Sequence, residues 1–187
     1  MKKNILIISI LSLFFGVANS QQVPQFSQNM FNKLANNPGS AGSSDAINAT
    51  VLHRTQWMGF EGAPQTFNMA IDAPVPLLNG GLGLNIVTDD IGEYSNLGLQ
   101  LSYAYRTDLG QGQLGLGISA GMFQSGLDGG SLIPADLGDM AIPTGDVSGS
   151  SMDFGGGIYF NTENVYLGLS SLHLSLIHIS EPTRLRR

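Results

Sequence analysis

Apolar and polar residues alternate along most of this chain. Side chains of an extended strand point alternately to opposite faces, so a period of two predicts β-strands. Seven strands are predicted in this way, in residues 47–57, 66–73, 81–87, 96–106, 113–122, 151–160 and 165–169. The clearest of them is residues 96–106, in which small or polar residues separate five large apolar ones: Leu97, Leu99, Leu101, Tyr103 and Tyr105. Because mostly short turns join the strands, the pattern indicates an all-β, antiparallel chain.

The face of these strands opposite the large apolar side chains indicates which face of the sheet points to the interior. It carries Gly, Ser, Asn and Gln with only isolated charges, and Lys, which soluble proteins place on exposed strand edges, is almost missing. A face of this kind suits a hydrated lumen, and strands of about ten residues cross a bilayer when tilted. We therefore predict an antiparallel transmembrane β-barrel of the outer-membrane type, with the apolar side chains toward lipid. The polar residues predicted to face the lumen are Arg54, Asn68, Asp72, Gln100, Arg106 and Asp153.

The predicted connections differ in length between the two ends of the barrel. Those at one end have seven, six and four residues, and those at the other have eight, eight and twenty-six. Bacterial barrels have short periplasmic turns and longer outer loops. We therefore expect residues 21–46 to form a periplasmic segment and residues 58–65 to lie at the outer rim. Aromatic residues should mark the two membrane interfaces, with Trp57 and Phe67 outside and Tyr103, Tyr105 and Phe160 on the periplasmic side. The candidate partner-binding residues of the outer loop are Trp57, Phe60, Glu61 and Pro64.

The segment before the first strand fits two local structures. Phe26, Met30, Phe31 and Leu34 would form the apolar stripe of a short helix that ends before the Asn-Pro-Gly turn of residues 37–39. An extended arm fits equally well, because short isolated helices are marginally stable in water.

The amino-acid composition excludes further classes of protein. The chain has 187 residues, of which 42% are hydrophobic and 12% charged, so it is too apolar for a disordered protein, and 25 glycines disfavour long helices. Residues 1–20 have the basic start, apolar centre and small-residue end of a secretory signal peptide, which predicts cleavage before Gln21. No apolar stretch is long enough to span a membrane as a helix.

Charge and the remaining motifs point away from several functions. Residues 21–174 hold three basic residues against thirteen acidic ones, so nucleic-acid binding is not expected. Residues 110–115 match G-x-G-x-x-G but open a strand rather than a helix, so they predict a turn. Asp89, Asp90 and Glu93 lack the spacing of a calcium loop, and His53 lacks a second metal ligand. We expect no catalytic residues, no cofactor and no metal site.

Four segments carry a family resemblance. The mature start QQVPQFSQNMFNKLANNPGSAG, then LHRTQWMGFEGAPQTFNMAI, GLGLNIVTDDIG and YAYR, together resemble the PorP/SprF family of type IX secretion system membrane proteins from Bacteroidetes, and VYLGLSSLHL is similar to a later family segment. The resemblance implies an outer-membrane β-barrel that takes part in protein secretion or gliding motility, with other components of that machinery and secreted cargo as its partners. It also implies a longer chain with more strands. Residues 47–174 would then form the N-terminal half of the barrel.

The last residues do not fit the barrel pattern. Residues 175–187 (SLIHISEPTRLRR) break the alternation and add three arginines. They resemble the translation of a sequencing adapter, so we expect a non-native tail.

A half barrel with this tail is expected to aggregate rather than insert into a membrane. Its two open strand edges would leave backbone groups unpaired in lipid, and each such group costs several kcal/mol. Gel electrophoresis of the chain as printed should show no heat-modifiable band. A heat-modifiable band with detergent-resistant β-structure would contradict this expectation.

Two further functional classes fit the pattern besides an anchor or partner-recognition component of a secretion machine. One is an outer-membrane pore for small solutes, and the other is a secreted β-sandwich adhesin. Conductance in planar bilayers would favour the pore. Sedimentation of the full-length protein with outer membranes after a high-salt wash would exclude the adhesin.

Overall fold

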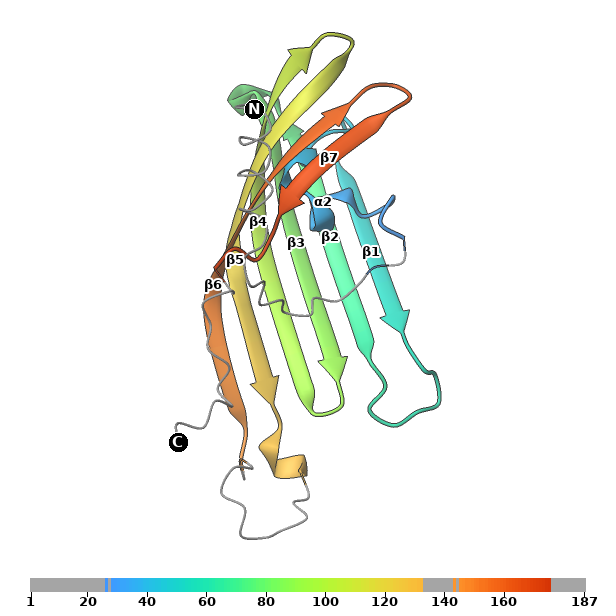
Figure 1. Ribbon diagram of the computed structural model, residues 1–187, viewed down its shortest axis with the longest axis vertical. Helices are drawn as coiled ribbons and strands as arrows, with labels where there is room; N and C mark the ends of the chain where they lie inside the picture. Colours follow the sequence, from blue (N-terminus) through green and yellow to red (C-terminus); the bar gives the residue numbers. More distant parts are fainter. Residues whose placement is uncertain (1–25, 27, 133–142, 144, 176–187) are drawn as a thin grey trace, which may run out of the picture.

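The computed structural model describes residues 26, 28–132, 143 and 145–175 of the chain. Seven antiparallel strands form one sheet in sequence order, and the sheet curls into an incomplete barrel (Figure 1). The strands are β1 (Asn48–Thr55), β2 (Gln65–Val75), β3 (Gly80–Ile91), β4 (Tyr94–Leu109), β5 (Gly112–Leu127), β6 (Val147–Asn161) and β7 (Tyr166–Ser171). The short helices are α2 (Lys33–Asn36), η1 (Pro38–Ser40), η2 (Pro76–Leu78) and η3 (Gly129–Ser131). None of the described helices has the length and apolar character needed to cross a membrane.

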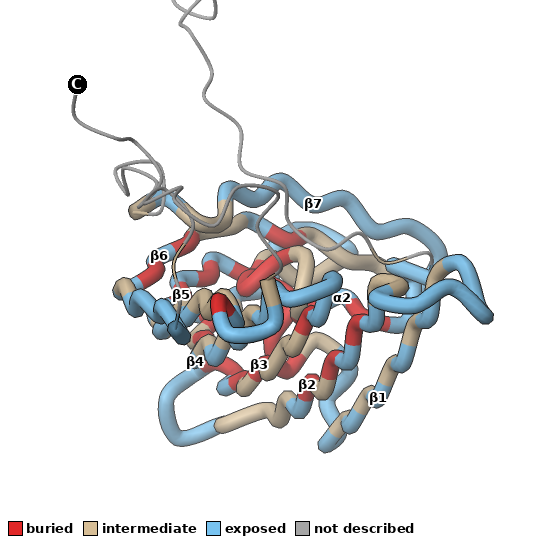
Figure 2. Tube along the Cα trace, turned by 90° about the horizontal axis from the view of Figure 1, so that it is seen from below, coloured by how far each residue is buried: buried red, intermediate tan, exposed pale blue. Residues whose placement is uncertain are grey.

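The polar face of the sheet lies inside the curl, as the sequence predicts. In β2 the side chains of Thr66 and Asn68 are buried, whereas Phe67 and Ile71 on the other face are each 38% exposed. The same alternation recurs in β4 and β5, where Ser102 pairs with Ser119 on the inner face. Buried residues accordingly gather on the inner side of the curl (Figure 2). This arrangement confirms an all-β, antiparallel sheet that curls into an incomplete β-barrel. Its polar inner face and apolar outer face are those of a membrane barrel, whereas a water-soluble sheet would bury its apolar face.

Every strand after β1 is longer than the alternation predicts, and four of the six connections are shorter, whereas β1 is shorter than predicted. The connection of β3 to β4 has only Gly92 and Glu93, where eight loop residues are expected, because Asp89 and Asp90 continue the strand opposite Asn96 and Ser95. The turn from β4 to β5 consists of Gly110 and Gln111. Both turns use a glycine with positive φ, 57° at Gly92 and 63° at Gly110, a conformation that tight hairpin turns require.

The loop asymmetry is confirmed only in part. At one end, called the turn end below, the connections have four, two and four residues; at the opposite loop end they have nine, two and nineteen. The β3–β4 connection is thus as tight as any at the turn end. Part of the longest connection, residues 133–142 and 144, falls outside the described residues.

The N-terminal segment fills the inner face of the curl. Among its described residues, from 28 onward, one turn of α-helix forms, in α2, and it is followed by η1; Leu34 is buried, while Met30 and Phe31 are exposed. The segment is therefore neither the single short helix nor the extended arm that the sequence allows, because it combines two short helices, α2 and η1, with irregular backbone. A small cluster forms where the segment meets the sheet: Leu34, Ala41, Ala70 and Ala104. This contact, rather than a large apolar core, occupies the interior.

Candidate functional site

The inner face carries a chain of buried asparagines. Asn68 of β2 is fully buried, and its amide nitrogen donates hydrogen bonds to Asn85 Oδ1 at 2.6 Å and to the carbonyl of Ile86 at 3.1 Å. Its Oδ1 accepts a hydrogen bond from Asn32, which comes from the N-terminal segment. Buried amides are costly unless they are hydrogen-bonded, so this row fixes the segment to β2 and β3.

Asp72 and Arg106 contribute differently to the inner face. The Asp72 carboxylate accepts a hydrogen bond from the backbone N–H of Gly42 at 2.8 Å and so holds the end of the N-terminal segment. Arg106 donates to the side chain of its neighbour Gln113. Gln100 is half-buried between them and the loop end, and its amide nitrogen makes no hydrogen bond within the described part of the chain.

Asp153 occupies the same face on β6. Its carboxylate is buried and lies 2.7 Å from Nδ1 of His173, just after β7. Arg54 is half-buried on β1, opposite Thr66 in the register. The structure thus places these residues on the inner side of the curl, where Asn68 and Asp72 make hydrogen bonds with Asn32 and Gly42 of the N-terminal segment.

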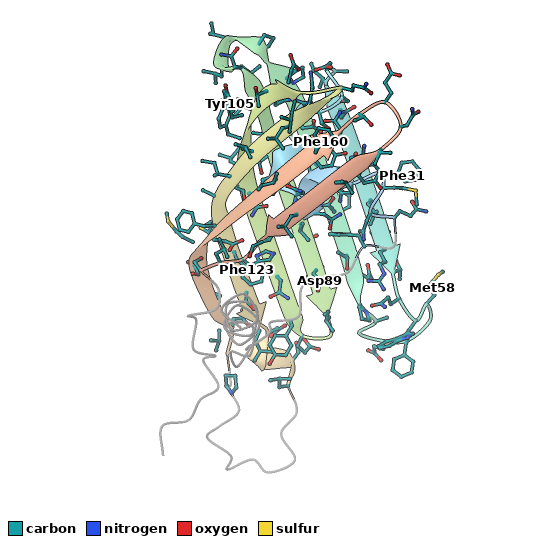
Figure 3. The ribbon with its side chains drawn as sticks, turned by 45° about the horizontal axis from the view of Figure 1, so that its top comes forward. Phe31, Met58, Asp89, Tyr105, Phe123 and Phe160 are labelled. Carbon is teal, nitrogen blue, oxygen red and sulfur yellow. The ribbon has the colours of Figure 1, made fainter. Side chains whose placement is uncertain are left out.

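The β1–β2 loop, residues 56–64, presents large apolar side chains to solvent at the loop end. Trp57, Met58 and Phe60 are 72%, 85% and 76% exposed. Figure 3 shows Met58 projecting from the tip of this loop, away from the sheet. Three large apolar side chains exposed together on one loop are typical of an interaction site.

Backbone hydrogen bonds hold this loop in shape. Gln56 N–H donates to the carbonyl of Pro64 at 3.0 Å, and Phe60 N–H donates to that of Trp57 at 3.0 Å. The loop is also joined to the β3–β4 turn, because Gly92 N–H donates to Gly62 O at 3.0 Å. A shallow hollow of about 230 Å³ lies between them, lined by Phe60, Gly62, Ala63, Gln65, Asp90 and Gly92.

The predicted loop residues contribute unequally to this surface. Trp57 and Phe60 form its apolar part, Glu61 is exposed beside them, and Pro64 is half-buried where the loop returns to β2. Trp57 has a φ of 47°, a left-handed conformation that is uncommon for a bulky residue. The sequence prediction missed Met58, the most exposed of the group.

The aromatic residues predicted for the two interfaces separate as expected along the barrel axis. Tyr105 pairs with Gly80 and Phe160 with Leu114, so both lie toward the turn end (Figure 3). Tyr103 donates a hydrogen bond from its hydroxyl to Leu78 O in η2 at the same end.

Acidic residues near the loop end serve local structure. Asp89 is buried and accepts a hydrogen bond from the Thr66 hydroxyl at 2.5 Å, whereas Asp90 points to the other face. Asp128 caps η3, and the hydrogen bond from the Ser131 hydroxyl is the main cause that lowers the pKa of its carboxyl below the ordinary value. In the described ranges, no three His, Cys, Asp or Glu side chains come close enough together to hold a metal ion.

The main feature that the sequence prediction missed is the occupied interior. Residues 32–42 cross the inner face and contact strands from β2 to β7 (Figure 1). The signal was present as glycine at alternate inner positions of β3, β5 and β6, which indicates close approach of another backbone.

Comparison with known proteins agrees with this architecture. The family described as type IX secretion system membrane protein PorP/SprF matches residues 18–184, and its match extends ten residues into the predicted tail. No curated protein and no solved structure matches the chain. The match covers most of the chain. The strands place polar residues on the inner face and apolar residues on the outer face, as a membrane barrel requires. The chain belongs to the PorP/SprF family of type IX secretion system membrane proteins.

Proposed function

We propose that this protein is an outer-membrane barrel component of the type IX secretion machinery that recognises partner proteins through its β1–β2 loop. Its family supports a part in type IX secretion. The observation that carries the finer role is the exposed trio of Trp57, Met58 and Phe60 on a hydrogen-bonded loop. Aromatic side chains on an ordered loop are the usual anchors of protein interfaces.

In this proposal the signal peptide of residues 1–20 directs export, and the loop end faces outward. The convex face, which is mostly apolar from β2 to β7, meets lipid. The partners are other type IX components, with secreted cargo as a further class. The adhesin alternative is disfavoured by the inverted faces, since a secreted sandwich would expose its polar face.

Replacing Trp57 and Phe60 together with serine is expected to reduce co-purification of type IX components by at least about tenfold, because one interface anchor contributes about 2 kcal/mol or more. The measurement is quantitative mass spectrometry after affinity purification of the natural full-length protein from detergent-solubilised outer membranes. Loss of cargo export should accompany it.

The matched control is Leu77→Ser. Leu77 is 92% exposed, but it lies in η2 at the turn end. Its substitution should leave the purified complex unchanged. Equal recovery of partners with the double variant and with the wild-type protein would rule out the loop as the recognition surface.

A further inference from the structure

Glycine lines the inner face where the N-terminal segment crosses it. A Cβ atom at Gly117 would lie 2.2 Å from the backbone nitrogen of Gly39, and one at Gly115 would lie 2.2 Å from its oxygen. Such distances are shorter than any real contact, so even alanine would collide with the segment. At Gly81 the nearest atom is again backbone, Ala41 O at 2.3 Å, whereas Gly83, Gly157 and Gly168 face the side chains of Leu34 and Asn37. The sheet therefore has a groove whose depth is set by missing side chains.

The turn of residues 37–39 fits this groove closely. Asn37 is buried; its Oδ1 accepts a hydrogen bond from Gly39 N–H at 2.8 Å, and its Nδ2 donates to Ile158 O of β6 at 2.9 Å. The hydroxyl of Ser40, also buried, donates to Asn37 O at 2.8 Å. The Asn37 side chain thus accepts a hydrogen bond from a backbone N–H of the turn and donates one to a backbone carbonyl of the sheet. A purely apolar residue could make neither hydrogen bond.

Contacts on both sides of this turn tie the segment to opposite halves of the sheet. Toward β2, Gly42 N–H donates to Asp72. Toward β6 and β7, the Lys33 ammonium lies 6.0 Å from the ring centre of Tyr159 and 5.1 Å from that of Tyr166, which is within cation–π range. The Ser170 hydroxyl of β7 donates to Asn36 O at 2.6 Å.

We propose that the inner face is a binding site for an Asn-Pro-Gly-Ser turn, and that the chain's own residues 32–42 occupy it as a resident plug. At Gly81, Gly115 and Gly117 the backbone of the segment packs directly on the backbone of the sheet. The interior of the barrel is then closed to solutes by the chain itself, which opposes the pore alternative. This inference goes beyond the role in secretion and does not depend on which partner the loop binds.

Cysteine protection tests the plug directly, since the sequence contains no cysteine. Ser40→Cys places a near-isosteric thiol in the buried turn, and Ser44→Cys places one at an exposed position four residues later. In outer-membrane vesicles that carry the natural full-length protein, a hydrophilic maleimide should label the Ser40→Cys variant at least about 100-fold more slowly than the Ser44→Cys variant, because labelling in the turn requires the segment to leave the groove. Equal labelling rates would overturn the proposal.

A second variant distinguishes groove binding from general burial. Adding Asn37→Ala to the Ser40→Cys chain should raise the labelling rate about tenfold, because it removes one buried and one part-buried hydrogen bond. Asn29→Ala, an exposed asparagine before α2, is the matched control and should change nothing. Should Asn37→Ala prevent folding, Ser170→Ala removes one contact from the sheet side and should raise the rate a few-fold. No acceleration with either variant would contradict the proposed groove, as would a steady open conductance of the wild-type protein in planar bilayers.

Discussion

Leu101→Arg is expected to destabilise the natural full-length protein in a bilayer by about 2–4 kcal/mol, the cost of arginine at the lipid-facing midplane of a membrane barrel. Leu101 is 59% exposed on the convex face and lies at the middle of β4. In a water-soluble sheet the same change at an exposed leucine would be nearly neutral. Reversible denaturant unfolding in phospholipid vesicles measures the difference.

The position of the arginine along the strand provides the control. Leu109 lies on the same face at the turn end of β4 and is also exposed. Leu109→Arg should cost only about 0–1 kcal/mol, because the penalty falls toward the membrane interface. Equal, small effects at both positions would show that the convex face meets water, and the outer-membrane assignment would then fail.

Gly117→Val is expected to destabilise the folded protein by about 3 kcal/mol or more. A valine side chain would occupy the place of Pro38 and Gly39, whose nearest atoms lie 2.2–2.5 Å from where its Cβ would stand. Overpacking of this kind costs about 1–3 kcal/mol, and displacing the segment also breaks buried hydrogen bonds worth about 1 kcal/mol each. Denaturant unfolding of the natural full-length protein gives the change, and limited proteolysis of residues 28–46 should become faster.

Gly98→Val is the matched control on the same face of the sheet. A Cβ at Gly98 meets its nearest neighbours, Phe123 and Val87 O, at 3.8 and 4.0 Å, which is ordinary contact. Valine is also favoured in strands. Its effect should therefore stay within about 0.5 kcal/mol, and a loss as large as that of Gly117→Val would mean that β-strand geometry, rather than the plug, explains the glycines.

Strand existence was predictable here, whereas strand ends were not. The period of two continues through Leu97 to Tyr105, and β4 contains this whole stretch. In β3, by contrast, the alternation of apolar residues ends before the strand does. Asp89 and Asp90 of β3 still pair with β4, although neither is apolar. Backbone hydrogen bonds extend a hairpin at little cost where polar side chains remain in water, as Asp90 does, or find a hydrogen-bond partner, as Asp89 does with Thr66. A pattern of apolar residues therefore underestimates the length of the hairpin.

Candidate site residues were predictable by face but not by contact. Alternation places Asn68, Asp72 and Asp153 on the polar face, and the curl of the sheet buries or half-buries them there. Nothing in the alternation indicates that Asp72 receives the N–H of Gly42 or that Asp153 faces His173. These partners lie 30 and 20 residues away in the chain, and only the folded sheet brings them together.

The sequence by itself determined the class of the protein: an inverted, antiparallel β-barrel of a secretion-system family, since period, face composition and the family segments are all local properties of the chain. Only the tertiary structure decided what fills the barrel. The fit of residues 32–42 depends on glycines from four strands that become neighbours when the sheet curls. A glycine in sequence is equally consistent with a turn, a weak strand or a close approach, and the distance to a remote backbone distinguishes these three.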